Sequence, residues 1–110
     1  MRRNTRSEPK RLPKSVHLFG YDFPVLMVPK DEVDRDGEAN IWGQYHALKG
    51  EVRIIKEAYP ALQWTLLLHE VLHIVSSNMM HDRLREVDVE VLAASMFEFL
   101  VENGLLEVNE

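Results

Sequence analysis

The fold is decided by residues 60–76, which read PALQWTLLLHEVLHIVS. Pro60 suits the first turn of a helix, where the N–H that proline lacks would have no partner. Apolar residues then surround the helix on nearly every side, and such a helix lies at the centre of its domain. His69, Glu70 and His73 interrupt the apolar run and make it too polar and too short to cross a membrane. The sequence therefore predicts a buried central helix that carries three ionisable groups.

A sheet and a second helix flank this central helix in the sequence. Apolar and polar residues alternate over residues 16–28, as in a pair of strands with one buried face. Two more strands are expected over residues 41–48 and 51–56. After the central helix, Asp82 is a suitable N-cap for a helix that runs to residue 103. The predicted class is α+β, with a small antiparallel sheet followed by the active-site helix and a second antiparallel helix.

Length and charge limit the classes of protein that remain. The 110 residues are enough for one domain, and the absence of cysteine excludes disulfide frameworks and cysteine-ligated metals. Residues 1–14 carry six Lys or Arg and one Glu, so we expect a disordered basic arm before a single domain over residues 15–110. The remaining 96 residues carry seven basic and 17 acidic side chains, which argues against nucleic-acid binding outside the arm. No signal-peptide core follows the basic start, and we expect a cytoplasmic protein that is not bound to membranes.

The central helix carries the pattern H-E-x-x-H at His69, Glu70 and His73. Two histidines four positions apart differ by about 40° around a helix, so both imidazoles leave the same face one turn apart. They are spaced to bind one Zn²⁺ at roughly 2.0–2.1 Å. Glu70 is turned away from direct ligation but can reach a water on the metal. This pattern predicts a zinc-dependent hydrolase in which Glu70 is the general base.

A catalytic zinc has three protein ligands, so a third ligand must come from elsewhere in the chain. If the two helices form an antiparallel hairpin with its centre near position 79.5, residue 86 is level with His73 and residue 90 with His69. Both positions are glutamates. We take Glu86 as the third ligand and keep Glu90 as an alternative ligand or as a hydrogen-bond partner of a histidine.

Other polar residues are weaker candidates. His81 could be a ligand, but it comes eight residues after His73, a step that fits no related zinc motif. Asp88 points away from Glu86 on the helix and is expected to be a solvated charge. Tyr45 and His46 precede the active-site helix on a predicted strand, and either could donate a hydrogen bond to the oxyanion of the transition state.

Three segments together resemble small phage-type metallopeptidases of the ImmA/IrrE-like group. They are GEVRII at residues 50–55, LQWTLLLHEVLH at 62–73 and EVDVEVLA at 86–93. The resemblance covers roughly residues 16–104. It implies a minimal, gluzincin-like zincin fold, with His69, His73 and Glu86 as metal ligands and Glu70 as the base. It also implies a bacterial or phage-infected cytoplasm as the location, and a sheet edge that could hold an extended peptide.

Two functions therefore remain for comparison. The first is a zinc-dependent metallopeptidase that hydrolyses peptide bonds of a peptide or protein substrate through a metal-activated water. The alternative is a catalytically silent binding or regulatory module that keeps the same fold. Glu70 distinguishes the two, because hydrolysis requires this base and a purely structural metal site does not. The oligomeric state and the identity of the substrate do not follow from the sequence.

Overall fold

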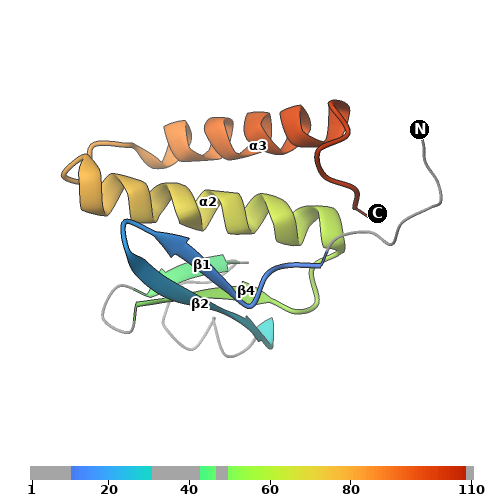
Figure 1. Cartoon of the computed structure of the whole chain (residues 1–110), viewed down its shortest axis with the longest axis horizontal. Helices are drawn as coiled ribbons and strands as arrows, with labels where there is room; N and C mark the ends of the chain where they lie inside the picture. Colours follow the sequence, from blue (N-terminus) through green and yellow to red (C-terminus); the bar gives the residue numbers. More distant parts are fainter. Residues whose placement is uncertain (1–10, 31–42, 47–49, 109–110) are drawn as a thin grey trace.

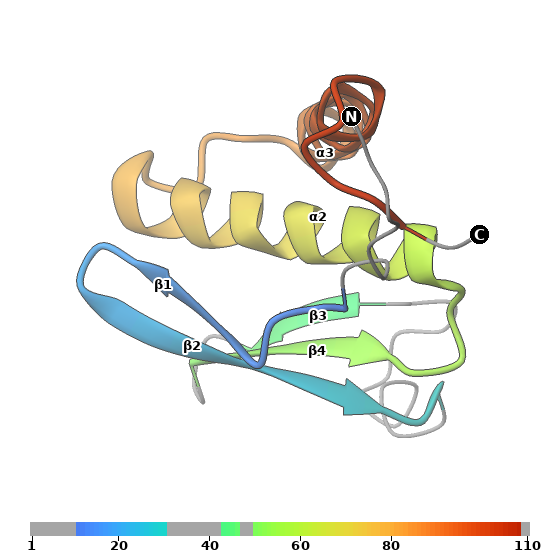
Figure 2. The same cartoon turned by 45° about the vertical axis from the view of Figure 1, so that its right-hand side comes forward.

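Four strands and two helices follow one another in the part of the chain that the structure describes. The computed structural model describes residues 11–30, 43–46 and 50–108, and of residues 43–46 only the backbone. The elements are β1 (Ser15–Leu18), β2 (Tyr21–Val28), β3 (Gly43–His46), β4 (Glu51–Ile55), α2 (Pro60–Met79) and α3 (Glu86–Glu102). They form three layers, with α2 between the sheet and α3 (Figure 1, Figure 2). The predicted α+β class, a small sheet followed by two helices, is confirmed.

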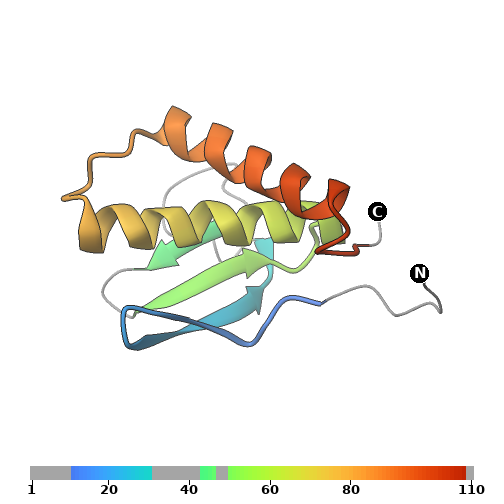
Figure 3. The same cartoon turned by 45° about the horizontal axis from the view of Figure 1, so that its top comes forward.

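The sheet is mixed, and its strand order is β1-β2-β4-β3. The first half of β2 pairs antiparallel with β1, and the second half pairs parallel with β4, so that Val25 lies beside Val52. Figure 3 shows β4 between β2 and β3, which is antiparallel to it. The parallel central pair corrects the expectation of an antiparallel sheet. A parallel pair needs a crossover of a dozen or more residues, and residues 29–50 supply that length.

One core lies between the sheet and α2. It joins apolar side chains of the two inner strands to α2; its buried members are Phe23, Val25, Val52, Ile54, Leu67 and Ile74. Leu12 also packs against this core, and the Lys14 carbonyl accepts a hydrogen bond of 2.8 Å from the Val25 N–H. Contact with the domain therefore begins inside the predicted arm, whose residues 1–10 lie outside the described part of the chain.

Both helices differ at one end from the prediction. α2 begins at Pro60 as expected but continues beyond Ser76 to Met79. α3 begins at Glu86 and not at Asp82, whose φ of 60° places it in the left-handed region. The N-cap of α3 is Arg85. A helix N-cap has extended φ and ψ angles, so the backbone of Asp82 rules it out for that role.

Candidate metal centre

The two histidines of the central helix face each other across one turn of α2. Their ring centroids are 4.9 Å apart, and the two Nε2 atoms are separated by 3.2 Å. The His69 side chain is 16% exposed and that of His73 is 34% exposed. Both imidazoles therefore present the same nitrogen to one point at the side of α2 that faces the start of α3.

Glu86 reaches this point from the first position of α3. Its Oε1 atom lies 2.9 Å from His73 Nε2, and its Oε2 atom lies 3.2 Å from His69 Nε2. Ligand atoms of these three residues lie within 4.8 Å of one another, and no other such group is found in the described part of the chain. The hairpin argument from the sequence thus identified the glutamate that joins the two histidines.

The spacing of these atoms fits a small tetrahedral cation. Bonds of about 2.0–2.1 Å in tetrahedral geometry separate the ligand atoms by roughly 3.3 Å. The observed separations of 2.9–3.2 Å are within a few tenths of an ångström of that value. Two imidazole nitrogens and one carboxylate leave a fourth position for water or substrate, as in catalytic zinc sites. The donor set and its geometry therefore fit Zn²⁺, although nothing in the structure names the metal.

Ser76 fixes the loop that brings Glu86 to the histidines. Ser76 is 3% exposed, and it lies seven positions after His69, on the same side of α2. Its carbonyl accepts hydrogen bonds from the N–H groups of Met80 and Asp82, at 3.1 and 2.8 Å. Its hydroxyl accepts a third from the Leu84 N–H at 3.1 Å. In the sequence, Ser76 is recognisable only as the expected end of the central helix, and no local signal there indicates this role.

A capping interaction fixes the first turn of α3. The Arg85 N–H donates to Asp88 Oδ2 at 3.1 Å, and the Arg85 guanidinium donates to both carboxylate oxygens at 3.0 and 3.1 Å. These hydrogen bonds lower the pKa of Asp88 and raise that of Arg85. Asp88 therefore caps the helix and is not the solvated charge that the sequence predicted. A glutamate, glutamine or aspartate three positions after an N-cap is a recognisable sequence signal for this role.

Glu70 lies on a different side of α2 from the two ligand histidines. It is 5% exposed and lies three positions after Leu67 and four before Ile74, both of which pack on the sheet. Glu70 therefore lies on the side of α2 that faces the sheet. Within the described residues, Glu70 is not part of the group of ligand atoms that His69, His73 and Glu86 form, and its role as the base stays a prediction.

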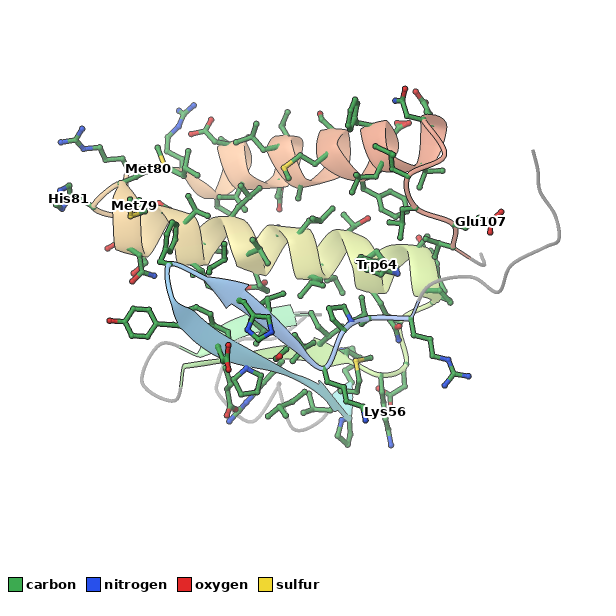
Figure 4. The ribbon with its side chains drawn as sticks, viewed as in Figure 1. Lys56, Trp64, Met79, Met80, His81 and Glu107 are labelled. Carbon is green, nitrogen blue, oxygen red and sulfur yellow. The ribbon has the colours of Figure 1, made fainter. Side chains whose placement is uncertain are left out.

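The remaining candidates do not join the cluster. Glu90 is exposed one turn further along α3, and it is not part of the group of ligand atoms. His81 lies exposed at the tip of the loop between the helices, where it points away from them (Figure 4). Tyr45 and His46 lie on β3, which contacts α2, but their side chains are outside the described part of the structure.

Comparison with known proteins adds no assignment. No family model, no curated protein and no solved structure matches the chain. The resemblance to ImmA/IrrE-like metallopeptidases therefore stays a prediction. Within the described residues, neither helix combines the length and the apolar character that a membrane span requires.

Proposed function

We propose that the chain is a zinc-dependent metallopeptidase. The observation that carries this proposal is the convergence of His69, His73 and Glu86 from two helices, with a glutamate directly after the first histidine. Two imidazoles and one carboxylate with an open fourth position form a catalytic rather than a structural donor set. The partial exposure of His73 and Glu86, 34% and 61%, gives a substrate access to this position.

Each residue of the site has a separate task. His69, His73 and Glu86 would hold the metal, which supplies a Lewis acid that polarises the substrate carbonyl and activates a water. Glu70 would accept a proton from the attacking water and pass it to the nitrogen of the leaving amine. The carbon–nitrogen bond then breaks, and water has been added across the peptide bond. A general acid–base of this kind contributes about 10²–10⁴-fold to the rate.

The substrate that this proposal implies is a peptide or protein in the cytoplasm. The site lies between α2 and the first turn of α3, and two of its three residues are partly exposed to solvent. Specificity would then come from contacts spread over the surface beside the cluster. A chain without cysteine carries no disulfide that would require an oxidising compartment.

The test compares the parent chain with Glu70→Gln and with Glu90→Gln as the matched control. Each protein is loaded with zinc, its metal content is measured, and cleavage of a quenched-fluorescent peptide library is followed. We expect all three to bind one zinc, and Glu70→Gln to lose at least about 100-fold in rate while Glu90→Gln keeps the parent's activity. Zinc binding without cleavage by the parent would favour the silent binding module. Equal cleavage by Glu70→Gln and the parent would remove Glu70 from the mechanism.

A further inference from the structure

One flank of α3 carries a short stripe of exposed apolar side chains. Its members are Leu92, Met96 and Phe99, which follow one another at steps of four and three. Such steps keep the three side chains within about 60° of one another around the helix. They are 41%, 40% and 58% exposed. We call these three residues the apolar stripe. It lies next to the side through which α3 is attached to the domain, where Val89 and Ala93 are buried.

A basic group lies before the apolar stripe, and an acidic group lies after it. The Arg85 side chain is 76% exposed, and its guanidinium donates to both carboxylate oxygens of Asp88, at 3.0 and 3.1 Å. These bonds hold the positive charge of Arg85 at the level of residue 88. Glu102 comes three positions after Phe99 and is exposed. Among the described residues, its carboxylate makes no hydrogen bond or ion pair.

The order of these groups matches a second copy of the same helix that runs in the opposite direction. In an antiparallel pair centred between residues 95 and 96, Leu92 of each copy is level with Phe99 of the other. Met96 is level with Ser95 of the second copy, whose small side chain leaves room for it. The spacing of Leu92, Ser95 and Phe99, at steps of three and four, is the a and d spacing of residues in a seam between two helices.

The same alignment supplies the missing partner of Glu102. This residue is level with residue 89 of the second copy, one position from Asp88, where the guanidinium of Arg85 is held. Each carboxylate therefore meets a cation of the other copy, and the contact occurs twice across the two-fold axis. A parallel pair would instead bring the two Glu102 carboxylates together. The charges thus favour a second copy in the antiparallel arrangement.

The surface is large enough for a dimer of moderate affinity. The apolar stripe, with Ser95 and the charged groups before and after it, offers on the order of 500 Å² on each copy, or about 1,000 Å² in total. Specific interfaces begin at about this total, and those at the low end are weak and reversible. We therefore expect the population of the dimer to depend on the protein concentration.

A second copy on the apolar stripe leaves the metal cluster open. Glu86 comes thirteen positions before Phe99, which places the two side chains about 140° apart around α3. The ligands therefore lie on one flank of this helix and the apolar stripe on the other. Figure 2 shows α3 as the outermost layer of the described elements, so the helix is accessible from outside the domain.

We propose that two copies of the chain associate through their apolar stripes, with the two α3 helices antiparallel about a two-fold axis. Leu92 of each copy packs against Phe99 of the other, and Glu102 of each copy pairs with Arg85 of the other. This inference goes beyond the peptidase activity and requires neither metal nor turnover.

The first test measures the oligomeric state of the full-length chain by analytical ultracentrifugation over a range of concentrations. We expect a monomer–dimer equilibrium with a Kd on the order of 10 μM, unchanged when zinc is removed with a chelator. The double variant Leu92→Ser, Phe99→Ser should raise this Kd at least tenfold. The matched control is Val87→Ser, Val91→Ser, which changes two apolar residues that are 54% and 60% exposed on another side of the same helix. Its Kd should equal the parent's. Because all four side chains are exposed, thermal unfolding should show that each variant retains the fold.

A pair of charge variants tests the orientation. Glu102→Lys places a cation against Arg85 of the second copy and should raise the Kd at least about fivefold. Glu98→Lys makes the same change of charge on an exposed residue of α3, but residue 98 comes nine positions after the buried Val89 and lies opposite the attached side. Its Kd should not rise.

Cross-linking locates the centre of the pair. The chain contains no cysteine, so a single introduced thiol can form a disulfide only with the same residue of another copy. Ser95→Cys lies at the centre of the antiparallel pair and should give a covalent dimer on mild oxidation. Ala94→Cys is the matched control, because Ala94 is also exposed but points about 100° away from residue 95. It should cross-link much more slowly.

Three results would overturn the proposal. A parent that stays monomeric up to concentrations on the order of 500 μM would exclude the dimer. A dimer that both double variants weaken equally, or that neither weakens, would form through a surface other than the apolar stripe. Equal rates of cross-linking for Ser95→Cys and Ala94→Cys, or equal Kd values for Glu102→Lys and Glu98→Lys, would exclude the antiparallel pair described above.

Discussion

The hydroxyl of Ser76 offers the most selective test of how Glu86 is positioned. Ser76→Ala removes the acceptor of the Leu84 N–H and leaves that donor without its partner in a partly buried position. The backbone carbonyl of residue 76 still accepts its two hydrogen bonds from Met80 and Asp82, so the loop keeps part of its anchor. The substitution therefore loosens the connection to α3 without removing a metal ligand.

The magnitude follows from the single lost hydrogen bond. An amide donor left unsatisfied in a buried or partly buried position costs about 1–3 kcal/mol, and we expect the lower half of that range here. Such a loss lowers the midpoint of thermal unfolding by roughly 4–8 °C for each kcal/mol in a domain of this size. Urea denaturation of the metal-free chain should give the same free energy with an unchanged m value. A residue that orients a metal ligand also typically contributes 10–100-fold to metal affinity, and zinc titration should show a loss of about tenfold.

Ser77→Ala is the matched control, because Ser77 is the next residue of α2 and is exposed. We expect it to leave both the stability and the zinc affinity at the parent's values. The reasoning is refuted if Ser76→Ala and Ser77→Ala unfold at the same urea concentration. If Ser76→Ala is destabilised but binds zinc as tightly as the parent, the loop is structural and does not position Glu86.

Three other perturbations have definite expected results. Arg85 lowers the pKa of Asp88, so this pair stabilises the folded state at any pH above 3.8, the ordinary pKa of the carboxyl group. That stabilisation is lost as the pH falls through the lower pKa that Asp88 has in the folded state. The stability difference between the metal-free parent and Asp88→Asn should therefore shrink on acidification, and a pH-independent difference would contradict this. Phe19→Asn should raise the free energy of unfolding by about 1 kcal/mol, since Phe19 and Gly20 both have positive φ angles and Asn-Gly is the preferred pair in such a hairpin turn; a urea midpoint at or below the parent's would refute it. A chain held at a free zinc concentration of 100 times its Kd should be about 2.7 kcal/mol more stable than the same chain after the zinc is removed with a chelator, as measured by thermal unfolding. No change on chelation would mean that the folded chain binds no zinc.

The site was more predictable from the sequence than the sheet was. Helical spacing fixes which residues share a face, so His69 and His73 could be paired without further information. In a short antiparallel hairpin, residues at equal distances from the turn face each other, and this rule identified Glu86 as the residue opposite His73. The N-cap of α3 is Arg85, three residues later than the predicted Asp82, yet Glu86 still lies opposite the histidines, because Ser76 folds the loop back against α2.

The sheet could not be derived in the same way, because strand pairing depends on contacts between distant segments. The alternation over residues 16–28 puts Tyr21 and Met27 on the same face as Phe23 and Val25, which predicts that all four are buried, but Tyr21 is 66% exposed and Met27 is 42% exposed. Phe23 and Val25 lie in the core with α2, but the alternation breaks after Val25, so that Met27 is exposed and its neighbour Val28 is buried against Ile55. The parallel pairing of β2 with β4 leaves no local signal in either strand, because it depends on the path of the intervening chain.

The most direct test of the metal centre is the zinc content of the untagged chain after zinc repletion and desalting, measured by inductively coupled plasma mass spectrometry. His73→Ala, Glu86→Ala and Glu90→Ala are measured beside the parent. The three-ligand site predicts one zinc per chain in the parent and in Glu90→Ala, and a strong reduction in the other two variants. A parent without zinc would contradict the site altogether, and zinc retained by Glu86→Ala but lost by Glu90→Ala would move the third ligand one turn along α3.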